Sequence, residues 1–318
     1  MRRRNNGAAE RLLFTLFAAP VHGLSGGANI RNAVSVTSDG RILHADGRQM
    51  ALSPSSVSSF RQCPLLFRLR HIDRRGEPAT PRLAAGIFVH ETLASLFALP
   101  PEERRLDVAQ SLFRDKWTAR RRSPRYGPLF GLDGDVDAPR AYTDVERERA
   151  WGLQAFEALR RYFALEDPTR FSPAGCEERV QAEITSLHAT DANIPLTGVI
   201  DRLDASPDGD GGLVVIDYKT GRSPPPHRAD SVWFQVEMYA LLLALQGRRP
   251  HSVKLLYLGD GVCLERTVDD ELLERVTESL RDVWEEIVSA ARADEWPCGQ
   301  RPESRFPCQC TLSVPEPR

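Results

Sequence analysis

The sequence predicts a mixed α/β fold in which a central β-sheet is flanked by helices. Apolar residues recur at helical spacing in segments before residue 165, whereas from about residue 178 they recur with the period of two that is typical of strands. One more helical segment, 233–246, separates the first three strand-like segments from the last two, and a final helix follows them. Helices, strands, a helix and further strands are the order expected of a mixed sheet with helices packed against it.

The first 50 residues carry seven arginines and little periodicity, so residues 1–50 are expected to be an extension that is disordered or results from a misplaced start. A weak hairpin is the one element that their pattern indicates. Arg2 to Arg4 and the apolar residues after them faintly resemble a secretion signal, but Glu10 and Arg11 interrupt the pattern and no clean cleavage site follows.

A folded domain is predicted over residues 51–292, beginning with an N-terminal helical region. Ser53 is a suitable N-cap and Pro54 suits the first helical turn, after which Val57 and Phe60 recur at helical spacing. Three more helices are predicted before the sheet, over residues 81–99, near 104–122 and near 142–164. The last helix is expected near 269–292, and residues 293–318 form a tail that contains cysteines.

Five strands follow from alternating segments bounded by turn residues. They are predicted over residues 178–189, 194–205, 212–220, 251–261 and 262–268. The helix over 233–246 should pack across the sheet that they form.

Composition excludes several classes of protein. With 318 residues, 41% hydrophobic and 27% charged, the chain is ordinary for a globular protein, and its net charge of −2 excludes a globally basic nucleic-acid binder. No apolar run is long enough to predict a membrane span, and six scattered cysteines do not make a disulfide scaffold, so a cytoplasmic protein is expected. The phosphate-binding loop of ATPases is absent, so any helicase that acts with this protein would be a separate chain.

The hairpin over residues 198–221 concentrates acidic side chains. Its middle matches the first positions of a calcium-binding loop, but Val215 stands where that loop requires glutamate, so Asp204, Asp208 and Asp210 are interpreted as solvated turn residues. If the hairpin is centred near residue 209, Asp201 lies opposite Asp217. Two carboxylates at that distance repel unless a cation or a proton lies between them, and oxygen ligands favour magnesium or manganese.

Lys219 shares a strand face with Asp217. Only three of the chain's 42 basic residues are lysines, so a lysine at this position indicates a role that arginine would not fill. An ammonium is compact and its pKa is tunable, whereas a guanidinium is planar and stays protonated. A surface ion pair is the alternative interpretation of an aspartate and a lysine two residues apart on a strand.

Four motifs in this order resemble the RecB-like branch of the PD-(D/E)XK nuclease superfamily. They are Gly86-x-x-x-His90, the segment from Gly198 to Asp204, the segment from Val215 to Gly221, and Gln235-x-x-x-Tyr239. The resemblance covers about residues 52–290 and is closest to the stand-alone RecB family exonucleases of actinobacteria and to the nuclease domain of AddB. It implies a restriction-endonuclease-like core.

The resemblance also implies roles for individual residues. His90, Asp201 and Asp217 match the family's metal ligands, the Tyr218 carbonyl is a further oxygen ligand, and Lys219 matches the catalytic lysine. Gln235 and Tyr239 match the helix that positions the substrate. Glu183, on the preceding strand, is either an outer part of this site or a surface residue. His90 has the alternative of a buried histidine bonded to the backbone.

Many relatives bind a [4Fe-4S] cluster through one cysteine in an early helix and three near the C-terminus. Cys63 fits the first position, and the tail offers Cys298, Cys308 and Cys310. Their spacing departs from the family's pattern, so a degenerate or altered C-terminal end remains the alternative to an intact cluster. Cys176 and Cys263 are interpreted as ordinary cysteines.

A cationic segment over residues 113–126 interleaves basic and aromatic side chains and is predicted to form a track for DNA, with solvated surface as the alternative. The candidate residues of this track are Arg114, Lys116, Trp117, Arg120, Arg121, Arg122 and Arg125.

The function predicted from these features is that of a Mg²⁺- or Mn²⁺-dependent DNA nuclease, an exonuclease that acts in repair or recombination. The alternative is a catalytically inactive relative that serves as a DNA-binding or iron–sulfur structural module.

Overall fold

The computed structural model describes residues 34–134, 141–188, 191–205, 212–225 and 232–299, together with Cys308 and Cys310. These residues belong to one compact unit, Asn32–Arg318. Among them, no helix combines the length and the apolar character that crossing a membrane requires.

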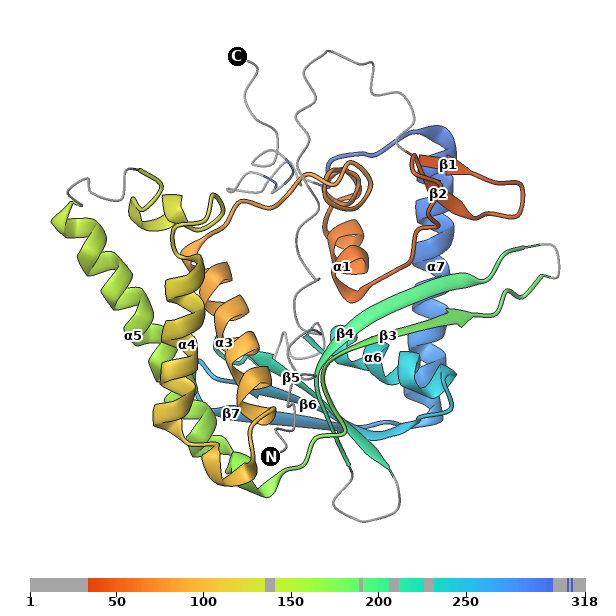
Figure 1. Ribbon diagram of the computed structural model, residues 1–318. Helices are drawn as coiled ribbons and strands as arrows, with labels where there is room; N and C mark the ends of the chain where they lie inside the picture. Colours follow the sequence, from red (N-terminus) through yellow and green to blue (C-terminus); the bar gives the residue numbers. More distant parts are fainter. Residues whose placement is uncertain are drawn as a thin grey trace, which may run out of the picture. The chain divides into compact units, whose positions relative to one another are not determined.

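A five-stranded mixed sheet forms the centre of the molecule (Figure 1) and confirms the predicted fold class. Its strands lie in the order β3-β4-β5-β6-β7, and every neighbouring pair is antiparallel except β5 and β6, which are parallel. The parallel pair requires a crossover, which α6 (Phe234–Leu245) provides. The strands are β3 (Gly175–Ile184), β4 (Ile194–Ala205), β5 (Leu213–Lys219), β6 (Pro250–Tyr257) and β7 (Val262–Thr267).

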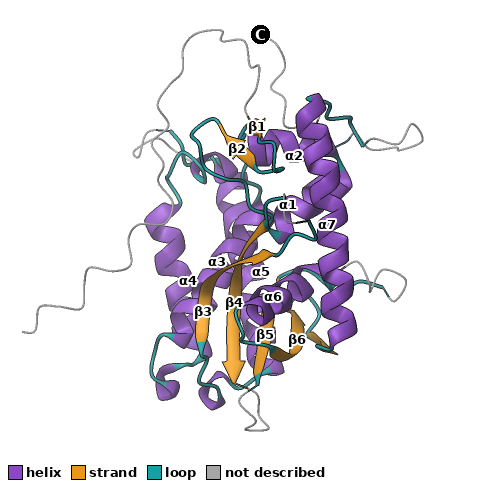
Figure 2. Ribbon diagram, turned by 90° about the vertical axis from the view of Figure 1, so that its right-hand side faces the viewer, coloured by secondary structure: helices purple, strands orange, loops and turns teal. Residues whose placement is uncertain are grey.

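Helices cover both faces of the sheet, and α6 crosses one of them (Figure 2). On that face, α6, α7 (Asp270–Ala293) and α1 (Pro54–Gln62) share a hydrophobic core with Leu203, Val215 and Leu255. On the other face, α3 (Pro81–Phe97), α4 (Leu106–Arg120) and α5 (Tyr142–Leu165) pack against Ile216 and Leu256. Because side chains alternate along a strand, β5 and β6 contribute residues to both cores.

Short elements connect these layers. They are α2 (Pro64–Phe67), a π-helix over Arg68–Ile72, and 3₁₀ helices over Pro101–Glu103, Gly127–Phe130 and Pro168–Arg170. As the sequence predicts, Ser53 caps α1: its hydroxyl accepts a hydrogen bond from the Ser56 backbone N–H, and Ser56 bonds the Ser53 backbone in return.

A hairpin of β1 (Val34–Val36) and β2 (Ile42–His44) precedes α1. Ile42 and Met50 are buried in the core, and the Leu52 backbone bonds to β4 through the Pro195 carbonyl and the Thr197 N–H. The boundary expected at residue 51 therefore lies inside the compact unit, because a sequence with little periodicity still contributes single apolar side chains to the core.

Candidate active site

Asp201 and Asp217 come together because of the register between β4 and β5. The ladder pairs Arg202 with Ile216, so the next step brings Asp201 opposite Asp217, which is the register expected for a hairpin centred near residue 209. The Tyr218 backbone N–H donates a hydrogen bond to Asp201 Oδ2 at 2.8 Å. This bond fixes the Asp201 carboxylate at the end of the β4–β5 pairing.

Glu177 on β3 is the third acidic residue of this row, and the sequence analysis missed it. The residues on either side of Glu177 pair with Arg202 and Ile200, so Glu177 lies opposite Asp201. Its φ of 50° is in the left-handed region, which is uncommon for a residue other than glycine and is a feature that clusters at functional sites. The signal in the sequence was only a pair of adjacent glutamates, of which Glu177 lies one residue before the start of the predicted strand.

His90 reaches the acidic row from helix α3. Its Nδ1 atom lies 3.2 Å from Asp201 Oδ1. One ligand atom from each of His90, Glu177 and Asp201 lies within 4.8 Å of the others, which is an arrangement that could hold a metal ion. A helix on one face of the sheet and two strands of the sheet therefore supply one imidazole and two carboxylates to a single point.

The protonation of the cluster reflects crowded negative charge. Burial and the nearby Asp201 carboxylate raise the pKa of Asp217 to about 6. Burial of its carboxyl group and the nearby Asp201 carboxylate also raise the pKa of Glu177 to about 7, although most of the Glu177 residue is exposed. Burial opposes the charged form of His90, but Asp201 and Asp217 outweigh it and raise the pKa of the imidazole to about 9. A cation placed among these groups would replace the protons that they hold.

Lys219 is held at the edge of the cluster by two partners. Its Nζ atom lies 2.7 Å from Asp217 Oδ2 and donates a hydrogen bond to Gln235 Oε1 at 2.7 Å. Gln235 Nε2 in turn donates to the Tyr239 hydroxyl at 3.0 Å. Tyr239 packs on Gly198, where an added Cβ would lie 2.7 Å from the ring, so the glycine lets α6 approach the sheet closely enough for this chain of contacts.

A family model described as the PD-(D/E)XK nuclease superfamily matches residues 51–311. This chain belongs to the PD-(D/E)XK nuclease superfamily. No curated protein matches the sequence. A solved structure named "Putative exonuclease", from Eubacterium rectale, is 11% identical, with 84% of this chain and 90% of that chain covered and a TM-score of 0.45. The structure of SSO0001 is 14% identical, with 63% and 84% covered and a TM-score of 0.28.

The side chains at this site suit the divalent metal ions that PD-(D/E)XK nucleases use. Asp217 and Lys219, two residues apart on one strand, have the spacing of the aspartate and lysine in the motif that names the superfamily. One imidazole nitrogen and several carboxylate oxygens, gathered around partly buried negative charge, form a donor set for a hard divalent cation. The residues therefore fit the ion that the superfamily implies.

Glu183 does not belong to this site. It pairs with Pro195, six residues before Asp201 on β4, which is a separation of about 20 Å at the usual rise of a strand. Its carboxylate accepts a hydrogen bond from Asn193 Nδ2 at 3.1 Å instead. The position on β3 that faces the site is that of Glu177, six residues earlier.

Asp204 is not the solvated turn residue that its sequence context suggested. It is buried, with 7% of its surface exposed, and it forms an ion pair of 3.0 Å with Arg202, whose side chain is completely buried. Arg202 also donates hydrogen bonds to Glu166 at 2.8 Å and to the Tyr218 hydroxyl at 2.9 Å. The Tyr218 hydroxyl thus points toward Arg202, while its ring packs edge-on against His90 with the centroids 5.9 Å apart and its backbone N–H bonds to Asp201. Asp208 and Asp210 lie outside the described residues.

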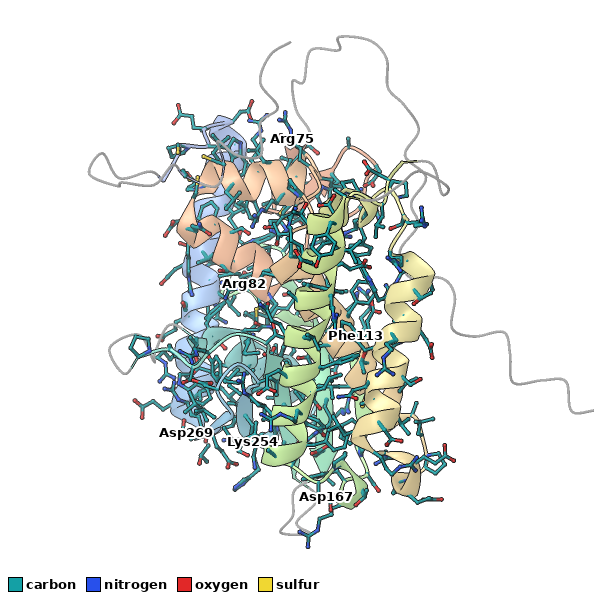
Figure 3. All side chains as sticks on the ribbon, turned by 90° about the vertical axis from the view of Figure 1, so that its left-hand side faces the viewer. Arg75, Arg82, Phe113, Asp167, Lys254 and Asp269 are labelled. Atoms are coloured by element: carbon teal, nitrogen blue, oxygen red, sulfur yellow. The ribbon has the colours of Figure 1, made fainter. Side chains whose placement is uncertain are left out.

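The predicted track on α4 is largely occupied by contacts within the protein. Trp117 is buried among aromatic rings and donates a hydrogen bond to Glu148, so it is not available to stack on a base. Figure 3 shows Phe113 of the same aromatic cluster between α4 and α5. Arg120 pairs with Glu91, and Arg121 pairs with Glu148.

The remaining members of the predicted track differ in their surroundings. Arg114 lies over the Phe156 ring, and Lys116 is half-buried, where burial lowers its pKa. Arg122 and Arg125 are exposed. The sequence could show the density of charge on α4, but it could not show which guanidinium groups already have acidic partners.

Four cysteines gather at a second site. The sulfur atoms of Cys63, Cys298, Cys308 and Cys310 all lie within 4.8 Å of one another. Cys63 Sγ accepts hydrogen bonds from the backbone N–H of Leu66 at 3.4 Å and of Gly299 at 3.2 Å. Although burial raises the pKa of this thiol, the two N–H groups lower it overall, which favours a thiolate. Convergent thiols with amide donors fit a metal group held by four thiolates.

Proposed function

We propose that this protein is a RecB-like deoxyribonuclease that depends on Mg²⁺ or Mn²⁺ and acts as an exonuclease in DNA repair or recombination. The observation that supports it best is the convergence of His90, Glu177 and Asp201 beside the Asp217–Lys219 ion pair. A donor set rich in oxygen favours magnesium or manganese over zinc. We place the protein in the cytoplasm, and any helicase that works with it would be a separate chain.

The residues of the site have separate roles in this proposal. His90, Glu177, Asp201 and Asp217 would hold the divalent ion, with the Tyr218 carbonyl as a further oxygen ligand. The ion acts as a Lewis acid toward the phosphoryl oxygens. Lys219, oriented by Asp217 and Gln235, brings a positive charge to the phosphate, holds the attacking water and stabilises the hydroxide that forms when this water loses its proton. Tyr239 keeps Gln235 in position for this task.

We also propose that the four clustered cysteines hold a metal group with a structural role. The family resemblance implies a [4Fe-4S] cluster. A single tetrahedral zinc ion is the second candidate, since sulfur atoms around zinc lie about 3.8 Å apart, which is within the 4.8 Å limit that bounds the distances between these thiols. Iron and zinc analysis of the purified protein distinguishes the two.

The nuclease proposal is tested with single- and double-stranded DNA labelled at either end, and with RNA of the same sequence. We expect cleavage of DNA with Mg²⁺ or Mn²⁺ and none with a chelator. Lys219→Met should lower the rate by about 10²- to 10⁴-fold, the usual contribution of a group that assists proton transfer. The position of the label that is released first gives the polarity of an exonuclease.

Lys254→Met is the matched control for this test. Lys254 lies on the neighbouring strand β6 and pairs with Glu265 at 3.3 Å, so its removal should leave the rate unchanged. An inert wild-type protein that still binds DNA would support the alternative of a catalytically inactive module. Unchanged activity in Lys219→Met would contradict the proposed mechanism.

A further inference from the structure

A groove with a volume of about 640 Å³ adjoins Lys219, and its described lining contains no residue of α3, the helix that carries His90. The N-terminus of α1 borders this groove, together with β3, β4 and α6. Its described lining includes Ser55, Ser58, Arg179, Val199, Lys219 and Gln235. The groove therefore continues directly from the proposed catalytic lysine and its partner glutamine.

The charge of this groove differs from that of the whole chain. The protein has 44 acidic and 42 basic residues, whereas the described lining of the groove holds two cationic side chains and no acid. Low-dielectric walls around charge of one sign concentrate the field and attract a ligand of the opposite sign. An anionic ligand that extends beyond the metal site is therefore favoured here.

Arg179 is the cation of this groove that the proposed chemistry does not use. It is exposed on β3, pairs with Val199 of the groove, and has no acidic partner among the described residues within ion-pair distance. It lies two residues beyond Glu177, which is about 7 Å along the strand. A guanidinium at this distance reaches the phosphate next to the one that the acidic cluster would hold.

The other walls suit a nucleic-acid backbone. Ser55 and Ser58 are exposed along one side of α1, and hydroxyl groups are common partners of phosphate oxygens. Phe234 and Tyr257 give the groove aromatic walls, but Tyr257 is buried and Arg61 lies over the Phe234 ring, so these rings shape the groove and are not surfaces for stacking bases. The volume is in the range of small-molecule sites, so it suits one or two nucleotides of a single strand rather than a duplex.

We propose that a single strand of DNA occupies this groove and that Arg179 binds the backbone phosphate adjacent to the scissile one. This inference rests on the proposed nuclease function and names the path of its substrate. In this proposal the groove beside α1 and β3, and not the segment on α4, is the surface that positions the DNA strand. Arg179 is a positioning residue, because it contacts the substrate one phosphate away from the reaction.

The test measures binding of a fluorescent 12-nucleotide single strand to protein that carries Asp217→Asn, so that cleavage does not interfere. Binding is recorded over a series of salt concentrations with Mg²⁺ present. Adding Arg179→Gln should reduce the slope of log affinity against log salt by about 0.7, the value for one phosphate contact on a single strand, and weaken binding roughly fivefold at 0.1 M salt. Arg179→Lys should keep the slope, because it keeps the charge.

Arg149→Gln serves as the matched control, since Arg149 is an exposed arginine on α5 far from the groove lining. The slope of log affinity against log salt for this variant should equal that of the Asp217→Asn protein. In the active protein, Arg179→Gln should raise KM and leave kcat nearly unchanged. A normal slope and KM for Arg179→Gln in a protein that cleaves DNA would overturn the groove proposal alone. Absence of cleavage by the wild type would instead overturn the nuclease function.

Discussion

Glu177 shows how a single residue completes the site. Its backbone φ of 50° interrupts the regular strand, and its carboxyl meets His90 and Asp201 within 4.8 Å. Strained residues of this kind persist where the surrounding structure holds them, and here β3 is paired to β4 on both sides of Glu177. Without Glu177, a cation at this point would keep His90 and the two aspartates but lose the oxygen on the β3 side.

We therefore expect Glu177→Gln to weaken the binding of the divalent ion. The concentration of Mg²⁺ that gives half-maximal cleavage should rise at least about tenfold, the lower end of what disturbing a metal-site partner causes. The measurement is a titration of activity with Mg²⁺ for the variant and the wild type. Glu183→Gln is the control on the same strand and should leave the titration unchanged, because Glu183 is bonded to Asn193. Equal effects of the two substitutions would contradict the assignment.

The site was predictable from the sequence where its chemistry is local. Asp201, Asp217 and Lys219 lie on one hairpin, so alternation and the position of the turn were enough to bring them together. Glu177 and Arg179 depend on the register of β3 and on a left-handed residue, neither of which leaves a pattern in the sequence. For the same reason the sequence leaves open whether Glu183 is an outer part of the site or a surface residue, and its pairing with Pro195 shows that it is a surface residue.

At the scale of the element, β4 carries two kinds of charge on opposite faces. Asp201 faces the site, while the next residue, Arg202, is completely buried between the rings of Phe97 and Phe171 on the other face. Glu166 and Asp204 neutralise its charge. This ion pair network ties α5 to β4 directly behind the proposed metal site.

Arg202→Leu should consequently destabilise the protein by about 3–5 kcal/mol, because it leaves buried carboxylates without a partner. Urea unfolding measures this change in the free energy of unfolding. Arg160→Leu gives the comparison: Arg160 pairs with Glu157 on the surface of α5, where solvent screens the two charges, so its removal should change the stability far less. A loss of stability for Arg202→Leu no greater than for Arg160→Leu would show that the network is not stabilising.

The elements themselves were predicted more completely than their contacts. α1 begins after the capping serine, and each predicted helix and strand of the core corresponds to an observed one, since periodicity and caps are local signals. The hairpin of β1 and β2 is less evident from its sequence, because three-residue strands are too short to show a period. The burial of Arg202 and Trp117 was not predictable, since charge and aromatic content alone do not reveal which side chains already have partners.

For the whole molecule, the cysteine cluster joins an early helix to the C-terminal residues. Cys63 lies at the start of α2, and its partners follow more than 230 residues later in the sequence. The chain before Cys298 packs beside it, where Trp296 stacks on Phe67 with ring centroids 5.8 Å apart. An added Cβ on Gly299 would lie 2.5 Å from the Gln62 carbonyl oxygen, so the two segments are closely fitted. A group bound by all four thiolates would close this long loop.

Cys63→Ser should remove the bound metal and lower the thermal midpoint, because a ligand that binds only the folded protein stabilises it. A loss of about 2–3 kcal/mol corresponds to a decrease of roughly 3–5 °C for a domain of this size. Metal content and the melting curve are measured together. Cys263→Ser is the control, since Cys263 is exposed on β7 and lies outside the cluster. Two results would contradict the proposed metal group: wild-type protein that contains neither iron nor zinc, or two variants with equal metal content and equal melting curves. The four thiols would then be a packing cluster, and the contacts of Trp296 would hold the segment around Cys298.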